Sequence, residues 1–111
     1  MSLSAKQPAK RLLKPSPKWS LYLIRTRTGS LYTGITIDVE QRFKAHTEGK
    51  QGAKYLRAKG PLEIVYRVEL GTKSLASKAE YWVKKLTKQK KEKIVSSQPD
   101  KESLLALLNI S

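Results

Sequence analysis

The segment from Trp19 to Arg25 constrains the fold more strongly than any other part of the chain. It is a nearly continuous apolar run, which is typical of a central strand covered on both faces. The apolar residues are Trp19, Leu21, Tyr22, Leu23 and Ile24. Thr28-Gly29-Ser30 then predicts a turn, and residues 31–37 are rich in β-branched and aromatic side chains. The two stretches together predict an antiparallel β-hairpin.

A third strand is predicted from Leu62 to Leu70, where apolar and polar residues alternate as on a half-buried strand. Asp38 with Gln41 three residues later resembles a capping box and predicts a helix that ends near Gly49. The inward stripe of this helix is expected to be Val39, Phe43 and Ala45 or His46.

Ser74 is the predicted N-cap of a longer helix whose apolar positions follow helical spacing. These positions are Leu75, Ala79, Trp82, Val83 and Leu86. Shorter helices are expected at residues 52–59, 89–95 and 101–109, the last with Leu104, Leu105, Leu107 and Leu108 to bury. The fold class is therefore predicted to be α/β of the α+β kind. It contains a small three-stranded antiparallel sheet flanked by helices, in the order β-β-α-(short α)-β-α-α-α.

The chain has 111 residues, a length that predicts one domain with one core. We expect a disordered basic arm at residues 1–18, a folded domain at 19–96 and an amphipathic C-terminal helix at 97–111 that docks on it. There are no cysteines, which excludes disulfides, thiolate zinc sites and cysteine nucleophiles. No apolar stretch is long enough for a membrane span, so the expected location is the cytoplasm.

The net charge of +14 indicates the class of partner. Such a field attracts polyanions, and nucleic acid is the first to consider because neutralised phosphates release counterions. An anionic membrane fits less well, since the basic residues are spread along the chain rather than opposite one apolar helical face. The basic arm has a second interpretation as a targeting peptide, and the whole charge has a simpler one as a soluble basic surface.

Candidate residues for chemistry are few, because the chain has a single histidine. Tyr22 and Tyr32 lie on the two hairpin strands, where cross-strand neighbours bring side chains together, and Gly34 leaves room for close backbone approach. Arg42 and His46 are four residues apart, so they lie on one helix face and could both point at one phosphate group. A helix turns by about 100 degrees per residue, which places Glu80 at the edge of the apolar stripe of its helix. Clefts form at such edges.

Each of these residues also has a structural interpretation. The tyrosines could be ordinary cross-strand aromatics, and Arg42 with His46 a solvated helix face. Glu80 and Lys84 have the i, i+4 spacing of a surface ion pair. The order of all five residues together, rather than any one of them, favours a site.

The segments Ser20-Leu21-Tyr22 and Tyr32-Thr33-Gly34, followed by Arg42 and Glu80, resemble the GIY-YIG nuclease domain. The likeness spans residues 19–95 and is closer still to the small stand-alone bacterial YhbQ-like proteins. It implies a metal-dependent DNA endonuclease or exonuclease, with a role in DNA repair or recombination, that leaves 5′-phosphate and 3′-hydroxyl ends.

The resemblance also implies residue roles. Tyr22 and Tyr32 would line the active site with Gly34 at the strand end, and Arg42 would contact the scissile phosphate. Some members have a histidine at the position of His46, and Glu80 would hold one Mg²⁺ or Mn²⁺ ion. The general base is open between the two tyrosines and His46, because either tyrosine would need a shifted pKa to act at neutral pH, and Tyr22 is preferred. Predicted nucleic-acid contacts are Gly34, Lys54, Arg57, Lys84, Lys85 and Lys88.

Two departures from the family pattern stand out. Ser20 replaces the first motif glycine, and no asparagine follows Glu80 in the expected region, since the only one is Asn109. The role of that asparagine is expected to be vacant or to be filled by a polar residue such as Lys84 or Thr87, with weak activity or altered substrate positioning as the result. The departure, with the lysine-rich segment 84–93, leaves a second hypothesis open, which is a basic nucleic-acid-binding module that keeps the fold without catalysis.

Overall fold

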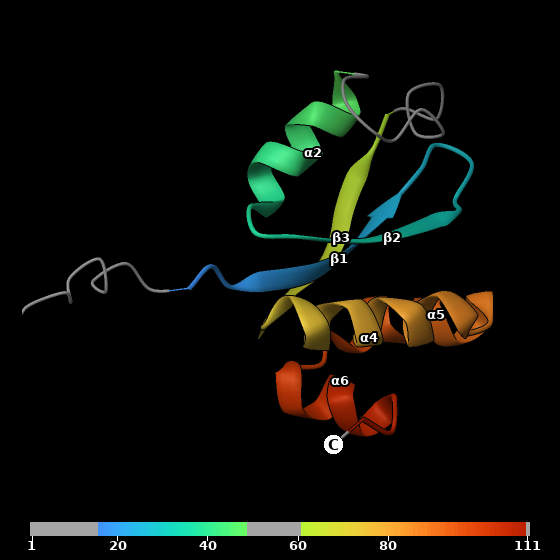
Figure 1. Ribbon diagram of the computed structural model, residues 1–111. Coiled ribbons are helices and arrows are strands. Elements are labelled where there is room, and N and C mark those ends of the chain that lie inside the picture. The colour runs from blue at the N-terminus through green and yellow to red at the C-terminus, as the bar shows by residue number, and fades with distance from the viewer. Residues whose placement is uncertain (1–15, 49–60, 111) are drawn as a thin grey trace, which may run out of the picture.

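The computed structural model describes residues 16–48 and 61–110, and these form one sheet with helices on both of its faces (Figure 1). The strands are β1 (Trp19–Arg25), β2 (Leu31–Thr36) and β3 (Glu63–Gly71). They pair antiparallel in the order β2-β1-β3, so β1 is central. The predicted α+β class and the hairpin are confirmed. The short helix predicted at 52–59 and most of the N-terminal arm lie outside the described residues.

Four helices are described, α2 (Val39–Thr47), α4 (Lys73–Lys85), α5 (Lys88–Ser97) and α6 (Lys101–Leu107). Asp38 caps α2 as predicted, since its side chain accepts a hydrogen bond from the Gln41 backbone N–H at 3.1 Å. In a full capping box the Gln41 side chain would accept from the Asp38 N–H. Here that N–H donates to Thr36 Oγ1 at 3.2 Å instead. The prediction of Ser74 as the cap of α4 was wrong, since Thr72 accepts from the Leu75 N–H at 3.1 Å.

Burial of β1 on both faces divides the core into two clusters. Leu21 and Leu23 face α4, α5 and α6, where Val83, Ile94 and Leu104 are completely buried. Tyr22 and Ile24 face the opposite side and pack with Val39 of α2. The sheet is therefore a middle layer between α2 and the other three helices (Figure 1).

Two residues predicted to be inward-facing are exposed. Trp82 of α4 has 45% of its surface exposed, and Ala76 occupies the buried face with Ala79 and Val83 instead. The buried stripe of α4 is narrow, because it consists of the small side chains of Ala76 and Ala79 with Val83, and Trp82 lies to one side of it. Leu107 of α6 is also exposed, whereas Leu104, Leu108 and Ile110 provide the buried contacts.

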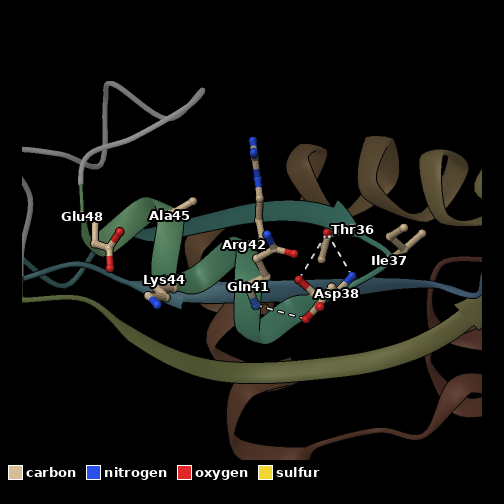
Figure 2. Close-up of a pocket in the computed structure, with 8 residues that line it drawn as sticks. All are labelled: Thr36, Ile37, Asp38, Gln41, Arg42, Lys44, Ala45 and Glu48. Carbon is tan, nitrogen blue, oxygen red and sulfur yellow. Dashed lines mark hydrogen bonds between the residues drawn. The ribbon is translucent and has the colours of Figure 1, made fainter.

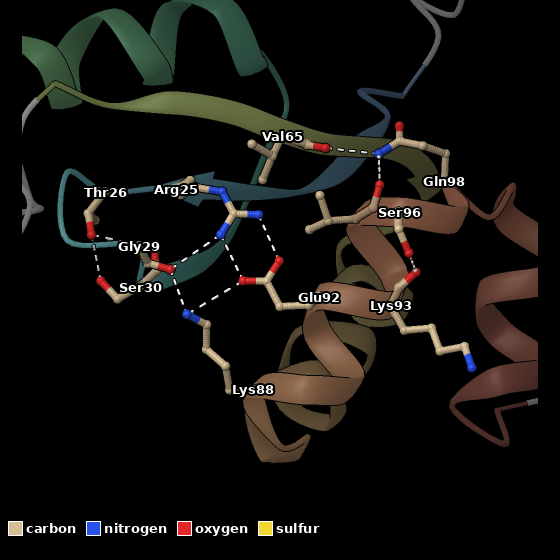
Figure 3. A network of polar contacts seen from close by, with 11 residues as sticks. Arg25, Thr26, Gly29, Ser30, Val65, Lys88, Glu92, Lys93, Ser96 and Gln98 are labelled. Carbon is tan, nitrogen blue, oxygen red and sulfur yellow. Dashed lines mark hydrogen bonds and ion pairs between the residues drawn. The ribbon is translucent and has the colours of Figure 1, made fainter.

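An ion-pair network fastens α5 to the hairpin turn (Figure 3). The Arg25 guanidinium donates two hydrogen bonds to the Glu92 carboxylate, both at 2.7 Å. Lys88 donates to the Gly29 carbonyl at 2.7 Å and lies 3.5 Å from the same carboxylate. Bidentate geometry makes this a stronger contact than an ordinary surface pair.

We predict that Glu92→Gln lowers the free energy of unfolding by about 1 kcal/mol at pH 7, a value discounted for the partial exposure of the pair. Arg25 lowers the pKa of Glu92 from 4.5 to about 2, so this stability is present above the ordinary pKa and is lost as pH falls toward 2. Urea unfolding between about pH 7 and about pH 2 measures the difference between parent and variant.

The matched control is Glu69→Gln, which removes an exposed carboxylate of β3 that forms no ion pair among the described residues. It should change stability little across the same range. A Glu92→Gln effect that persists unchanged at low pH would contradict the ion-pair explanation.

Candidate functional site

The centre of the candidate site is a buried hydrogen bond between a strand and a helix. The Tyr22 hydroxyl of β1 lies 3.0 Å from Nε2 of His46 on α2. Both side chains are almost fully buried, with 2% and 1% of their surface exposed. The sequence placed both residues in the site but gave no sign of this bond, because it depends on how α2 crosses β1.

Tyr32 completes an aromatic cluster with these two residues. Its ring centroid lies 5.5 Å from His46 in an edge-on arrangement and 6.5 Å from Tyr22. Tyr32 pairs with Ile24 across the hairpin, so it is a diagonal neighbour of Tyr22 on the same sheet face. The predicted meeting of the two tyrosines is therefore present in the structure.

Gly34 lies directly opposite Tyr22 in the strand register. A Cβ atom at this position would overlap the Tyr22 hydroxyl and ring carbon Cζ. Gly34 is buried, so its lack of a side chain makes room for the tyrosine. This burial gives it a packing role, and its contact with nucleic acid stays a prediction.

Arg42 brings positive charge to the tyrosine and histidine. Its proximity lowers the pKa of Tyr22, against the larger effect of burial, and its charge lowers the pKa of His46. Its side chain extends away from the α2 axis at the rim of an open depression of about 460 Å³ (Figure 2). The depression is lined by Thr36, Ile37, Asp38, Gln41, Arg42, Lys44, Ala45 and Glu48.

Glu80 approaches from α4, in the helix layer on the other side of the sheet. Its side chain is 24% exposed, which agrees with the predicted place at the edge of the apolar stripe. Its negative charge raises the pKa of Tyr22, so its carboxylate lies within electrostatic reach of that hydroxyl. It also pairs with Lys84 at 3.2 Å, as the i, i+4 spacing predicts.

The donor set limits the kind of metal that the site could hold. Among the described residues no group of three or more histidine, cysteine or carboxylate side chains is close enough to form a metal cage. A single accessible carboxylate suits Mg²⁺, which keeps several waters and takes further oxygen ligands from substrate phosphate. The residues present therefore fit a substrate-assisted metal site and do not fit a closed structural one.

The ionisation of Tyr22 differs from what a direct general base requires. Burial raises its pKa to about 12, against the lowering effect of Arg42, so the phenol is protonated at neutral pH. The preference for Tyr22 as the general base stays a prediction. The phenol acts as a hydrogen-bonding partner of His46.

His46 is neutral at pH 7. Burial and the charge of Arg42 both lower its pKa below 6.5. Its Nδ1 atom is buried and has no hydrogen-bond partner within the described part of the chain. A neutral imidazole with Nε2 beside a phenol can accept a proton from it.

The predicted nucleic-acid contacts differ in their surroundings. Lys84 and Lys85 are exposed on α4, where Lys85 lies 5.1 Å from the Tyr81 ring centroid and Tyr81 packs edge-on against Trp82. Lys88 contributes to the α5 network, so it has a structural role. Lys54 and Arg57 lie outside the described residues.

The absent family asparagine has one remaining substitute. Thr87 caps α5 by accepting from the Lys90 N–H at 3.2 Å, so its hydroxyl is occupied. Of the two predicted substitutes, Lys84 is the one that lies beside Glu80, so it is better placed to take the role of the asparagine. Asn109 lies after α6 with a positive φ of 62°.

The fold and this arrangement of side chains define a known class. A family model described as the GIY-YIG catalytic domain matches residues 18–93. The chain belongs to the GIY-YIG family. These domains are nucleases, generally dependent on divalent metals, so the family supports a nuclease-type activity on nucleic acid.

Within this family, the chain is similar to small bacterial UPF0213 proteins. It is 54% identical over 92 residues to a UPF0213 protein of Yersinia enterocolitica, covering 83% of this chain and 92% of the relative. It is 51% identical over 90 residues to the UPF0213 protein YhbQ of Salmonella arizonae, covering 81% and 89%. The resemblance predicted from the motifs is confirmed.

A solved structure has a similar fold. The solution NMR structure of a protein from E. faecalis aligns with a TM-score of 0.53 at 33% identity, covering 74% of this chain and 86% of that one.

Among the described residues, no helix has the length and apolar character that a membrane span requires.

We predict that Gly34→Ala displaces Tyr22 and lowers the free energy of unfolding by about 1–3 kcal/mol, the usual range for an overpacked core. Urea unfolding measures the loss, and the Tyr22→Ala background is the control. There the three atoms nearest to the added methyl are absent, so Gly34→Ala should become nearly neutral. Equal losses in both backgrounds would contradict the packing role of Gly34.

We also predict that the imidazole of His46 titrates below 6.5, which NMR can follow directly because the chain has one histidine. The unfolded chain then binds this proton more readily, so unfolding free energy falls as pH drops below 6.5. Arg42→Gln should raise the midpoint by removing a nearby positive charge. Lys44→Gln, on the exposed side of the same helix, should not. A midpoint of 6.5 or higher in the parent would contradict the prediction.

Proposed function

We propose that this protein hydrolyses phosphodiester bonds of DNA at one centre formed by Tyr22, Tyr32, Arg42, His46 and Glu80. The observation that carries the proposal is the buried Tyr22–His46 hydrogen bond, on which the charges of Arg42 and Glu80 both act. A phenol, a neutral imidazole, a guanidinium and a carboxylate supply a proton path, an anion contact and an oxygen ligand. RNA remains an alternative substrate of the same chemistry.

The proton path runs from water through Tyr22 to His46. As the water oxygen forms its bond to phosphorus and the bond from phosphorus to the 3′ oxygen breaks, the water proton passes to the Tyr22 oxygen while the Tyr22 proton passes to His46 Nε2. The leaving 3′ oxygen takes a proton from solvent and becomes the 3′-hydroxyl. The phenol then never becomes a free phenolate, which its pKa of about 12 would oppose. The imidazolium is held briefly, because Arg42 and burial both favour its return to the neutral form.

Arg42 would bind the phosphate under attack. A guanidinium donates two parallel hydrogen bonds to phosphate oxygens and stabilises the charge that develops on them. Its position at the rim of the depression leaves it accessible to a substrate strand (Figure 2). The Tyr32 ring, edge-on to His46, keeps the imidazole oriented toward Tyr22.

Glu80 would hold one Mg²⁺ or Mn²⁺ ion, with phosphate and water as its other ligands. When bound, such an ion polarises the phosphate and stabilises the oxygen that leaves as the 3′-hydroxyl. Lys84 now occupies one side of the carboxylate, so Glu80 must turn from it toward the substrate. Lys84 is then free to contact a phosphate.

The overall charge of +14 supports binding to the DNA backbone, with Lys84 and Lys85 as the exposed contacts nearest to Glu80. Such contacts give affinity that falls with salt and carry no base recognition. We place the activity in the bacterial cytosol or nucleoid, in DNA repair or recombination.

A second candidate function is binding without cleavage. The Glu80–Lys84 ion pair and the missing asparagine favour it, since a carboxylate neutralised by lysine binds metal weakly. On this hypothesis the same basic surface binds nucleic acid and the Tyr22–His46 bond is only structural.

Glu80→Gln distinguishes the two hypotheses. Labelled single-stranded, duplex, nicked and branched DNA is incubated with parent or variant in Mn²⁺ or EDTA. We predict metal-dependent cleavage by the parent and a loss of at least about 100-fold in the variant, as expected when charge stabilisation is removed. Glu102→Gln, an exposed carboxylate of α6, is the matched control and should cut like the parent.

Absence of cleavage on every substrate, together with salt-sensitive binding that Glu80→Gln leaves unchanged, would support the binding module. Cleavage by Glu80→Gln at the parental rate would contradict the assigned centre even if the protein is a nuclease.

A further inference from the structure

The depression beside Arg42 has features that the proposed chemistry does not use. Its volume of about 460 Å³ is within the range of about 300–1,000 Å³ that small-ligand sites occupy. Of its eight lining residues, only Arg42 belongs to the proposed centre. If Arg42 contacts the scissile phosphate, a neighbouring group of the same substrate strand would lie at the depression.

The charge of the lining argues against a second phosphate. Asp38 and Glu48 oppose Arg42 and Lys44, so the acidic and basic side chains balance although the whole chain carries +14. A balanced lining fits an uncharged group. The uncharged parts of a nucleic acid are its sugars and its bases, and of the two only a base has a flat apolar face with polar edges.

Ile37 and Gln41 provide complementary contacts for such a group. Ile37 is an exposed apolar side chain, with 55% of its surface accessible, in a position between β2 and α2. The side-chain amide of Gln41 forms no hydrogen bond to any described residue. In a capping box it would accept from the Asp38 N–H, but here that N–H donates to Thr36 instead. Both side chains line the same depression as Arg42 (Figure 2).

We propose that this depression binds the nucleobase adjacent to the scissile phosphate, with Ile37 against its face and Gln41 on its edge. An amide offers one donor and one acceptor side by side, which matches the N6 amine and N7 of adenine. The protein would therefore cut with a preference for adenine at this position. This inference rests on the proposed function, because it takes Arg42 as the phosphate contact.

Cut-site mapping tests the preference. DNA of randomised sequence is digested with Mn²⁺ by the full-length parent, Ile37→Ala and Gln41→Ala, and the ends are sequenced. We expect adenine enriched beside the cut by the parent and at least about fivefold less enriched in Gln41→Ala, the lower end for a bidentate contact. Ile37→Ala should weaken the enrichment and raise KM more than it lowers kcat.

The matched controls are Gln89→Ala and Leu107→Ala, which remove an exposed glutamine of α5 and an exposed leucine of α6. Both should keep the parental preference. Cleavage without any base preference, or a preference that survives in Gln41→Ala, would overturn the inference and leave the proposed nuclease function intact.

A binding measurement decides the inference independently of cleavage. 5′-Phosphorylated deoxyadenosine and thymidine dinucleotides are titrated into the parent without divalent metal and followed by NMR. The Gln41 side-chain amide and Ile37 methyl signals should shift more with the adenine dinucleotide, and those of Gln89 and Leu107 should not. Equal shifts with both dinucleotides, or none at Gln41 and Ile37, would refute the base subsite.

Discussion

Burial of β1 on both faces is the constraint on which the rest of the structure depends. Alternation along this strand sends Leu21 and Leu23 into the core beneath α4, α5 and α6 and sends Tyr22 toward α2. A polar phenol in that second core needs a partner, since an unsatisfied buried hydroxyl costs about 1–3 kcal/mol. His46 supplies the partner, so the packing of the sheet and the geometry of the candidate site have one origin.

The two helix layers bring side chains of different chemical character to the proposed site. α2 presents Arg42 and His46 from one side of the sheet, and α4 presents Glu80 from the other. The small residues Ala76 and Ala79 draw α4 close to the sheet, and the Arg25–Glu92 pair fastens α5 beside it. Rigid placement of this kind is what phosphoryl transfer requires, because positioning and electrostatics provide most of its catalysis.

Patterns among neighbouring residues predicted most of the helices and strands, whereas the contacts between these elements were harder to predict from the sequence. The apolar run of β1, the Thr28-Gly29-Ser30 turn and the Asp38 cap are written in neighbouring residues, and all three are confirmed. Trp82 was predicted to be buried because its spacing fits the helical stripe, but the width of that stripe depends on how closely α4 packs. The motif residues predicted which side chains would be neighbours, and their roles stay predictions. The Tyr22–His46 bond, the burial of Gly34 and the raised pKa of Tyr22 arise only from packing.

We propose that Glu80 and the Tyr22–His46 pair belong to one centre although they come from opposite layers. Paramagnetic broadening by Mn²⁺ tests this directly in the full chain, with a phosphorothioate dinucleotide present to supply the phosphate ligand. We expect Mn²⁺ to broaden the His46 imidazole and Tyr22 ring signals in the parent and Glu80→Gln to abolish the effect. Equal broadening in parent and variant, or none in the parent while signals elsewhere are broadened, would contradict it.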